Sequence, residues 1–345
     1  MTIGRRDLLT AAGAMVAASA STLLPQAALA DEAADFYKGK TVRILVGSPP
    51  GGGYDLYARM LAPHLAKRLG ATVIIENRDG NGGLMALNFL LSRPADGLTL
   101  MHASAEAAAL SQLLQREGSI WDVTALNWLG KTSAAPKLWF VGKNSKIRTV
   151  QDALAAERVV WASTGPADNI SDIAAVISHV IGLKSKIVIG YKGAGDMSLA
   201  VVSNEVDSGI LSADSALNGV KNGDLRPIAI FDSKRWNRLP DVPTLAEVAK
   251  IDPSKAWMAN LRQGIGDAQR AMVTNAGVPA ARVAYLRSVW TQILTDPEVV
   301  EEGARSNREI NYMSGAELQS VIGTLMKEAA PRVPELKQVL LNSYF

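Results

Sequence analysis

The segment "VRILVGSPPGGGYD", Val42–Asp55, decides the fold class of this chain. A short apolar run ends at two prolines and three consecutive glycines, and a segment with helical spacing follows directly. Glycine loops between a strand and a helix bring backbone N–H groups close to a bound group, because glycine has no side chain in the way. The segment therefore predicts a strand, a ligand-holding loop and a helix, in that order.

Strand and helix patterns continue to alternate beyond this segment. A first series runs from "VRILVG" to "LTLMHA", Val42–Ala103, and a second from "KLWFVGK" to "RPIAIF", Lys137–Phe231. Alternation of this kind is typical of a parallel sheet covered by helices. The two series therefore predict an α/β fold with two lobes.

The last third of the chain has helical rather than strand patterns. Helices are expected at Pro279–Leu294, Pro297–Ala304 and Gly315–Glu328, because each begins at a proline or at a helix-capping sequence. A helical tail with too few strands for a third sheet is expected to pack against the first lobe.

Composition and charge exclude several classes of protein. The 345 residues suffice for two domains, and the formal net charge of +3 is spread without a basic block, which argues against nucleic-acid binding. The sequence contains no cysteine, which excludes disulfides, thiol nucleophiles and a cysteine-linked lipid anchor. After the first thirty residues, no run reaches the ~18 apolar residues of a membrane span.

Residues 1–30 have the features of an export signal. A basic start precedes an alanine-rich apolar run, and Ala28–Ala30 has the small-x-small pattern of a cleavage site. The pair Arg5-Arg6, followed by leucines, resembles a twin-arginine signal, with ordinary secretion as the alternative. Both routes predict a soluble, exported protein of the periplasm.

The usual signatures of enzymes and metal sites are missing from the sequence. The three histidines, His64, His102 and His179, have no metal-ligand spacing, and structural or surface roles are expected for them. No G-x-S-x-G nucleophile motif and no complete phosphate or dinucleotide loop is present. We therefore expect no catalytic residue, no cofactor and no metal.

Five loops follow predicted strands, at the edge where open α/β sheets bind their ligands. They are rich in Gly, Ser, Thr and Ala, and most open directly into a helix, whose unsatisfied N–H groups attract anions. Asp55 is expected to cap or enter the helix after the glycines. The five loops are "SPPGGGYD", "HASAE", "ASTGPADN", "GYKGAGD" and "SADS". Their distribution over both series predicts an anionic ligand held between the lobes.

These motifs together resemble a known family. The stretch from "VRILVGSPPGGGYD" through "VIIENRDGNGG", and later "PADGLTL", "VVWASTG", "YKGAGD" and "NGDLRPIAIFDSKRWNRLPDVPTLAE", is similar to the substrate-binding proteins of tripartite tricarboxylate transporters, also called Bug receptors. The resemblance covers nearly all of the chain after residue 30. It implies a type-2 periplasmic binding fold that closes around a small carboxylate and delivers it to a membrane permease.

The resemblance also implies which residues bind the ligand. It places one ligand carboxylate at the glycine loop of the first lobe and the other end at loops of the second. The implied contacts are Pro50, Gly51, Gly52, Gly53, Tyr54, Asp55, Ser104, Ala105, Ser163, Thr164, Gly165, Tyr191, Lys192, Gly193, Ser212 and Asp214.

Four features depart from the family pattern. Tyr54 stands where many members have Thr or Ser, and Leu211 stands where many have Asp. Pro63 lies within the first predicted helix and should kink it. Ala256–Val273 lacks the strand-like stretch of common members, so an unusual end of the pocket is expected there.

The sequence thus predicts a signal peptide at 1–30, a first lobe at 36–137 plus 231–345 and a second lobe at 138–230. The expected protein is a monomeric receptor that binds an organic carboxylate and delivers it to a tripartite tricarboxylate-type permease. The alternatives are a ligand-sensing partner of a membrane kinase and an exported enzyme. Dicarboxylates, tricarboxylates, acidic amino acids and aromatic acids are all compatible with the five loops.

Overall fold

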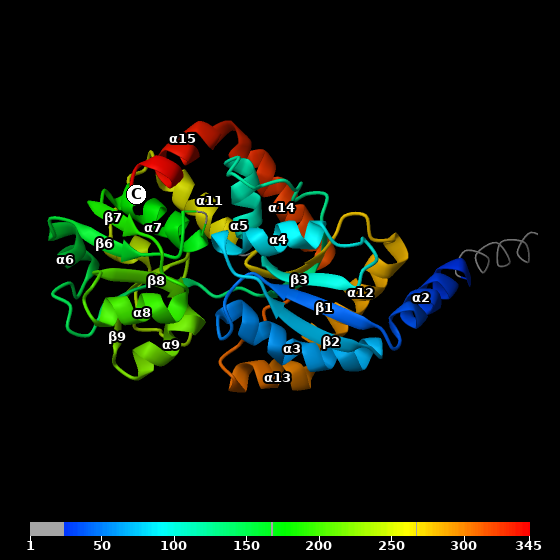
Figure 1. Ribbon diagram of the computed structural model, residues 1–345. Coiled ribbons are helices and arrows are strands. Elements are labelled where there is room, and N and C mark those ends of the chain that lie inside the picture. The colour runs from blue at the N-terminus through cyan, green and yellow to red at the C-terminus, as the bar shows by residue number, and fades with distance from the viewer. Residues whose placement is uncertain (1–23, 167, 267) are drawn as a thin grey trace, which may run out of the picture.

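The computed structural model describes residues 24–166, 168–266 and 268–345, which form two α/β lobes side by side (Figure 1). Residues 1–23, with most of the predicted signal peptide, lie outside the described residues. The predicted cleavage site after Ala30 falls within helix α2 (Leu24–Tyr37). The α/β fold class expected from the alternating patterns is confirmed.

Lobe one is built on a six-stranded mixed sheet in the order β11-β4-β10-β3-β1-β2. Strands β1, β2 and β3 are parallel, whereas β10 pairs antiparallel with both β3 and β4, and β11 pairs antiparallel with β4. The strands are β1 (Thr41–Val46), β2 (Thr72–Asn77), β3 (Thr99–Ser104), β4 (Asn127–Ser133), β10 (Arg270–Thr274) and β11 (Met313–Ser314).

Lobe two contains a five-stranded sheet in the order β7-β6-β8-β5-β9. Strand β6 is parallel to β7 and β8, and β5 runs antiparallel to β8 and β9. The strands are β5 (Lys137–Gly142), β6 (Val159–Ala162), β7 (Ser185–Val188), β8 (Ser208–Ser212) and β9 (Leu225–Phe231). The chain enters this lobe through Ala134–Pro136. The predicted return to lobe one at residue 231 is wrong, because Trp236, Val242 and Leu245 pack in the cores of lobe two. The chain returns to lobe one only at β10.

Helices cover both faces of each sheet. Those of lobe one are α3 (Gly53–Leu69), α4 (Leu84–Leu91), α5 (Ala105–Leu113), α12 (Ala280–Leu294), α13 (Pro297–Arg305) and α14 (Gly315–Ala329), with the short η1 (Asn81–Gly83). Those of lobe two are α6 (Val150–Ala155), α7 (Asn169–Ile181), α8 (Ala194–Val202), α9 (Ala213–Lys221) and α10 (Leu245–Val248). Helix α11 (Ala256–Gly266) packs on α7. Helix α3 contains Pro63 and continues beyond it to Leu69.

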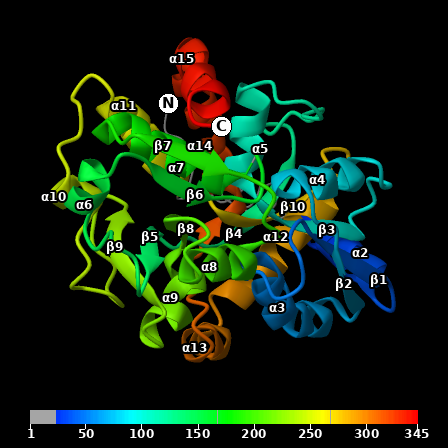
Figure 2. The ribbon, with the colours of Figure 1, turned by 60° about the vertical axis from the view of Figure 1, so that its left-hand side comes forward.

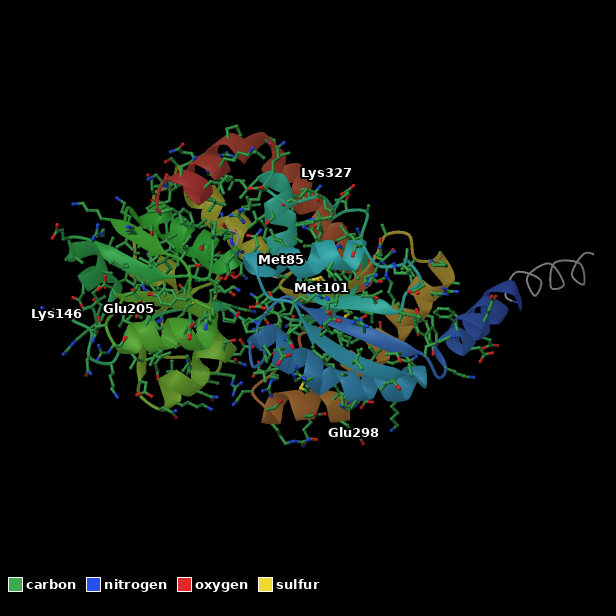
Figure 3. The ribbon with its side chains drawn as sticks, in the orientation of Figure 1. Met85, Met101, Lys146, Glu205, Glu298 and Lys327 are labelled. Atoms are coloured by element: carbon green, nitrogen blue, oxygen red, sulfur yellow. The ribbon has the colours of Figure 1, made fainter. Side chains whose placement is uncertain are left out.

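Each lobe has its own apolar core, as expected for separate sheets with covered faces. The large side chains Trp128 and Trp290 are fully buried in lobe one, and Trp139 and Trp161 pack together in lobe two with ring centroids 4.8 Å apart. Met101 on β3 is buried, whereas charged side chains such as Glu205, Glu298 and Lys327 lie on the surface (Figure 3).

The sequence pattern predicts that the whole helical tail packs on lobe one. The structure contradicts this prediction for the last part of the tail. Helices α12, α13 and α14 pack on lobe one, but α15 (Val333–Lys337) and η3 (Gln338–Asn342), reached through η2 (Ala330–Arg332), cross to lobe two (Figure 1). Leu336, Val339 and Leu340 enter the core around α7, and the Tyr344 carbonyl accepts a hydrogen bond from the Ile187 N–H at 2.7 Å. These apolar side chains find their burial on the second lobe.

Replacing Leu340 with Ala should therefore destabilise the protein. The side chain is 1% exposed, and truncating a buried leucine costs about 2–5 kcal/mol of unfolding free energy. Leu199→Ala is the matched control, since Leu199 is 67% exposed on α8 and its loss should stay within about 0.5 kcal/mol. Urea unfolding of both variants measures this, and equal losses would contradict the packing of the tail.

Candidate functional site

Asp55, in the first turn of α3, holds the glycine loop between β1 and α3 in place through hydrogen bonds. The Gly51 N–H, the Arg59 Nε–H and the Asn77 amide donate to the Asp55 carboxylate at 2.8, 2.9 and 2.9 Å. Burial by itself would raise the pKa of Asp55, but these hydrogen bonds outweigh burial and lower the pKa. Asp55 is therefore an ionised brace of the loop.

His102 supports the loop from the sheet. Its Nδ1 lies 3.1 Å from the Tyr54 carbonyl oxygen and its Nε2 lies 3.2 Å from Thr132 Oγ1. Burial lowers the pKa of this imidazole to about 4, so the ring is neutral at physiological pH. In a neutral ring, the Nδ1–H donates a hydrogen bond to the Tyr54 carbonyl and Nε2 accepts one from the Thr132 hydroxyl, which fixes the backbone of Tyr54.

A cavity of about 280 Å³ lies between the lobes, where all five predicted loops meet. Figure 2 shows α8 and α9 of lobe two beside α3 of lobe one. The lining residues are Gly47, Ser48, Pro49, Gly52, Gly53, Tyr54, Asp79, Gly80, Asn81, Gly82, Ser104, Lys137, Thr164, Gly165, Asp168, Asn169, Ile170, Tyr191, Lys192, Gly193, Ala194, Leu211, Ser212, Ser215 and Arg270. We call this the cleft cavity.

Arg270, the first residue of β10, is the main cation on the lobe-one side of the cleft cavity. It is 2% exposed, and its two terminal nitrogens contact the Asp214 carboxylate of α9 at 3.0 and 3.1 Å. Its Nε and the buried Tyr54 hydroxyl have no hydrogen-bond partner among the described residues. Burial raises the pKa of the Tyr54 hydroxyl, so this group stays protonated. Two N–H or O–H donors therefore remain for a bound acceptor.

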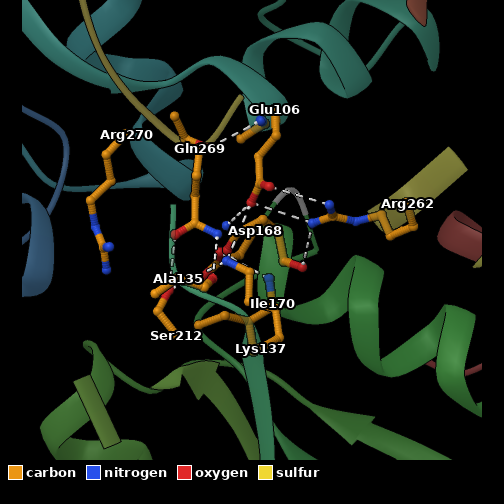
Figure 4. Close-up of polar contacts among 12 residues, drawn as sticks. Glu106, Ala135, Lys137, Asp168, Ile170, Ser212, Arg262, Gln269 and Arg270 are labelled. Atoms are coloured by element: carbon orange, nitrogen blue, oxygen red, sulfur yellow. Dashed lines mark hydrogen bonds and ion pairs between the residues drawn. The ribbon is translucent and has the colours of Figure 1, made fainter. Parts of the chain in front are cut away.

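Lys137, the first residue of β5, brings a second cation to the cleft cavity (Figure 4). Its Nζ lies 3.5 Å from Glu106 Oε1 and 3.4 Å from Ser212 Oγ, which are long contacts for an ammonium group. Arg262 of α11 contacts the same Glu106 carboxylate at 3.3 and 3.4 Å. Burial would raise the pKa of Glu106, but Arg262 and Lys137 outweigh it and lower the pKa to about 2.

Asp168 is the N-cap residue of α7 and lines the lobe-two wall of the cleft cavity. Its carboxylate accepts from the Ile170 N–H at 3.2 Å and from the Thr164 hydroxyl, so it orders the "ASTGPADN" loop. Burial raises the pKa of Asp168. Tyr191 and Lys192 line the same wall, and the Tyr191 hydroxyl donates to Glu205 at 2.8 Å.

The structure brings ten of the sequence-predicted ligand residues to the cleft cavity. These are Gly52, Gly53, Tyr54, Ser104, Thr164, Gly165, Tyr191, Lys192, Gly193 and Ser212. The other six stand behind or beside the lining: Pro50, Gly51, Asp55, Ala105, Ser163 and Asp214. Asp55 braces the loop, and Asp214 is occupied by Arg270. Ala105 and Ser163 are fully buried, and the Ser163 hydroxyl bonds Ser171 at 2.5 Å.

Sequence reasoning missed the two buried cations of the site. In the sheet registers, Arg270 of β10 lies opposite Ser104, the last residue of β3, and Lys137 of β5 lies opposite Ser212, the last residue of β8. Both pairings are antiparallel, so the amino ends of β10 and β5 reach the edge where the parallel strands end. Strand directions within a mixed sheet are needed to find them.

Comparison with known proteins identifies the family. Residues 57–336 match the family described as the tripartite tricarboxylate transporter family receptor. The chain belongs to this receptor family. A relative from Cupriavidus necator, the UPF0065 protein in the gbd 5′ region, is 26% identical over 336 residues, covering 94% of this receptor and 96% of the relative. Protein BugT of Bordetella pertussis is 29% identical over 229 residues, covering 62% and 68%.

Solved structures share the fold of the receptor. The R. palustris protein Rpa4515 with adipate has a TM-score of 0.73 and 20% identity, covering 87% of this chain and 97% of its own. MatC of Rhodopseudomonas palustris with bound malate has a TM-score of 0.69 and 19% identity, covering 86% and 98%. In the described part of the receptor, no helix is long and apolar enough to cross a membrane. No group of three or more candidate metal ligands occurs among those same residues.

Asp55→Asn should remove a pH-dependent contribution to stability. A carboxylate whose pKa is lowered by folding stabilises the folded state above its ordinary pKa of about 4, and the contribution is lost as the pH falls through the folded value. Wild type should therefore be more stable than the variant at neutral pH, and the difference should shrink in acid. Urea unfolding between about pH 7 and pH 3 measures it. A difference independent of pH would show that Asp55 is not an ionised brace.

Proposed function

We propose that this receptor is a periplasmic binding protein that closes its lobes on a small organic carboxylate and delivers it to a tripartite tricarboxylate-type permease. One observation carries the proposal. The free Tyr54 hydroxyl and Arg270 Nε belong to residues that line one cavity with the start of α3 and with Lys137. A carboxylate supplies the acceptors that these donors lack.

Gly52 and Gly53 support the same proposal, because they have no side chain that would fill the cavity between the lobes. A Cβ on Gly53 would lie 3.1 Å from both Arg270 Nη2 of lobe one and Ser215 Oγ of lobe two, so a side chain at this position would fill the space between the lobes. Gly52 and Gly53 begin α3 without a side-chain cap, which leaves N–H groups of the first turn for a ligand. Adipate and malate in proteins of the same fold are small acids of the expected kind.

Gly52→Val should abolish binding of the acid while both lobes still fold. A Cβ at this position would meet Ser48 Oγ at 3.1 Å and the Pro49 carbonyl at 3.2 Å, so the loop must move. Gly323→Val in α14 is the matched control, because nothing lies within 4 Å of its Cβ and α14 does not line the cleft cavity. A panel of mono-, di- and tricarboxylates, including adipate and malate, should contain an acid that raises the melting temperature of wild type and of the control but not of Gly52→Val.

The size of the effect follows from mass action. A ligand at about 100 times its dissociation constant stabilises the folded state by about 2.7 kcal/mol, which is readily seen in a thermal melt. If no acid in the panel shifts the melting temperature of wild type, the carboxylate proposal is wrong. An equal shift in Gly52→Val would instead show that the glycine loop is not the ligand site.

Export and delivery are tested in the cell. Replacing Arg5 and Arg6 by Lys should keep the protein in the cytoplasm if the twin-arginine route carries it, and cell fractionation measures this. Periplasmic protein at the wild-type level would point to ordinary secretion. Deleting the receptor should abolish uptake of the labelled acid found in the panel. Normal uptake with a lost transcriptional response to the acid would favour the sensing alternative.

A further inference from the structure

A second cavity of about 530 Å³ lies beside the segment through which the chain enters lobe two and beside the segment that follows β9. Its walls come from Ala134–Pro136, from the segment 231–237 after β9, from the end of α11 and from residues 309–311. We call it the hinge cavity. It shares only Lys137 with the cleft cavity among the described lining residues, so it is a separate space.

The two cavities meet at a thin polar partition. Gln269 and Arg270 are consecutive, yet Gln269 lines the hinge cavity and Arg270 lines the cleft cavity. Successive side chains at a strand point to opposite faces, which accounts for this division. The Gln269 amide oxygen accepts from the Ser212 hydroxyl at 3.2 Å, and the amide nitrogen donates to the Ala135 carbonyl at 3.3 Å (Figure 4). These bonds hold Gln269 between the two cavities.

The hinge cavity contains two deeply buried cations. Lys137 is 6% exposed and Arg262 is 3% exposed, and both share a single carboxylate, that of Glu106. The Arg262 Nε–H has no hydrogen-bond partner in the described part of the chain. Buried polar groups normally have partners, and an unpaired N–H on a cation is costly. The deep end of this cavity therefore carries an excess of positive charge and a free donor.

The acidic side chains that line the hinge cavity do not neutralise this positive charge. The described lining holds four basic side chains, Lys137, Lys234, Arg235 and Arg262, against two acidic ones, Asp232 and Glu309. Asp232 already accepts from the Ser233 N–H and hydroxyl, and Glu309 contacts Arg238 at 3.7 Å. Arg235 is paired with Glu247 at 3.0 Å, whereas Lys234 is exposed.

We propose that the hinge cavity is a second binding site, which takes a small molecule bearing an oxyanion group, either a carboxylate or a phosphate. Such a group accepts from the free Arg262 Nε–H and from Lys137, and the exposed Lys234 attracts it to the mouth. The cavity volume is within the range of small-molecule sites. This site is distinct from the cleft cavity and stands whether or not the cleft binds a carboxylate.

Inorganic phosphate is the probe for this site. Calorimetric titration of the receptor, at an ionic strength fixed with chloride, should give saturable binding. Gln263→Glu, in the cavity lining on α11, places a negative charge beside the bound anion, and Lys234→Glu replaces a cation by an anion. Each should weaken binding by about tenfold or more, which corresponds to about 1.4 kcal/mol. Lys250→Glu is the matched control, because it makes the same charge change at an exposed lysine outside the lining and should leave the affinity unchanged.

The outcomes separate the two sites. Gly52→Val should retain phosphate binding, whereas phosphate lost in Gly52→Val but kept in Gln263→Glu would place the anion in the cleft and overturn the proposal. Equal weakening by Lys234→Glu and Lys250→Glu would reduce the effect to general charge attraction and would also overturn it. Absence of saturable binding to wild type would do the same. Thermal melts without phosphate show whether the variants fold. Repeating the calorimetric titration with a monocarboxylate shows whether the hinge cavity prefers a carboxylate or a phosphate.

Discussion

The buried carboxylate of Glu106 is the constraint on which the arrangement of the two lobes depends. It lies in the first turn of α5 with no exposed surface, and such a charge is tolerated only when oppositely charged and hydrogen-bonding groups surround it. Its partners are Lys137 of β5, Arg262 of α11 and Asn169 of α7. One side chain of lobe one thus determines where three elements on the opposite side of the cleft can lie, because moving any of them leaves a buried ion without its partner.

Two further ion pairs join the lobes around this centre. Arg116, after α5, contacts Asp172 of α7 at 2.5 and 3.2 Å, with both side chains buried, and Arg270 contacts Asp214 of α9. Buried pairs of this kind add little net stability compared with apolar packing, but they penalise every arrangement that separates the partners. Together with the tail that crosses from α14 to lobe two, they explain why the lobes meet closely at Gly53 and Ser215. The relative arrangement of the lobes follows from charge pairing as well as from the chain segments that connect them.

The sequence predicted the parts of the fold that depend on local pattern. The five loops that follow strands, which include the glycine loop, and the helices α12 to α14 follow from residue spacing and capping signals, which act within a few residues. It did not predict β4 or β10, because "NWLGKTS" and "RAMVT" have no clear alternation and owe their strand state to neighbours in the sheet. The missed cations Lys137 and Arg270 have the same origin, since antiparallel pairing across the sheet brings the first residue of a strand to the ligand edge.

The charge balance of the cleft limits how it can hold an acid under the proposed function. The Asp214 carboxylate accepts from one N–H of each terminal nitrogen of Arg270, and the Ser133 hydroxyl accepts from the other N–H of Nη1. A guanidinium has five N–H groups, so the Nε–H and one Nη2–H remain for a two-point contact with a ligand carboxylate. The Tyr54 hydroxyl and the backbone N–H groups that begin α3 are further donors. Affinity therefore depends on this charge-assisted contact and on donors fixed in place by Asp55 and His102. A site of this design depends on the shape of its loop, because each donor contributes only while the backbone of the glycine segment is held in position.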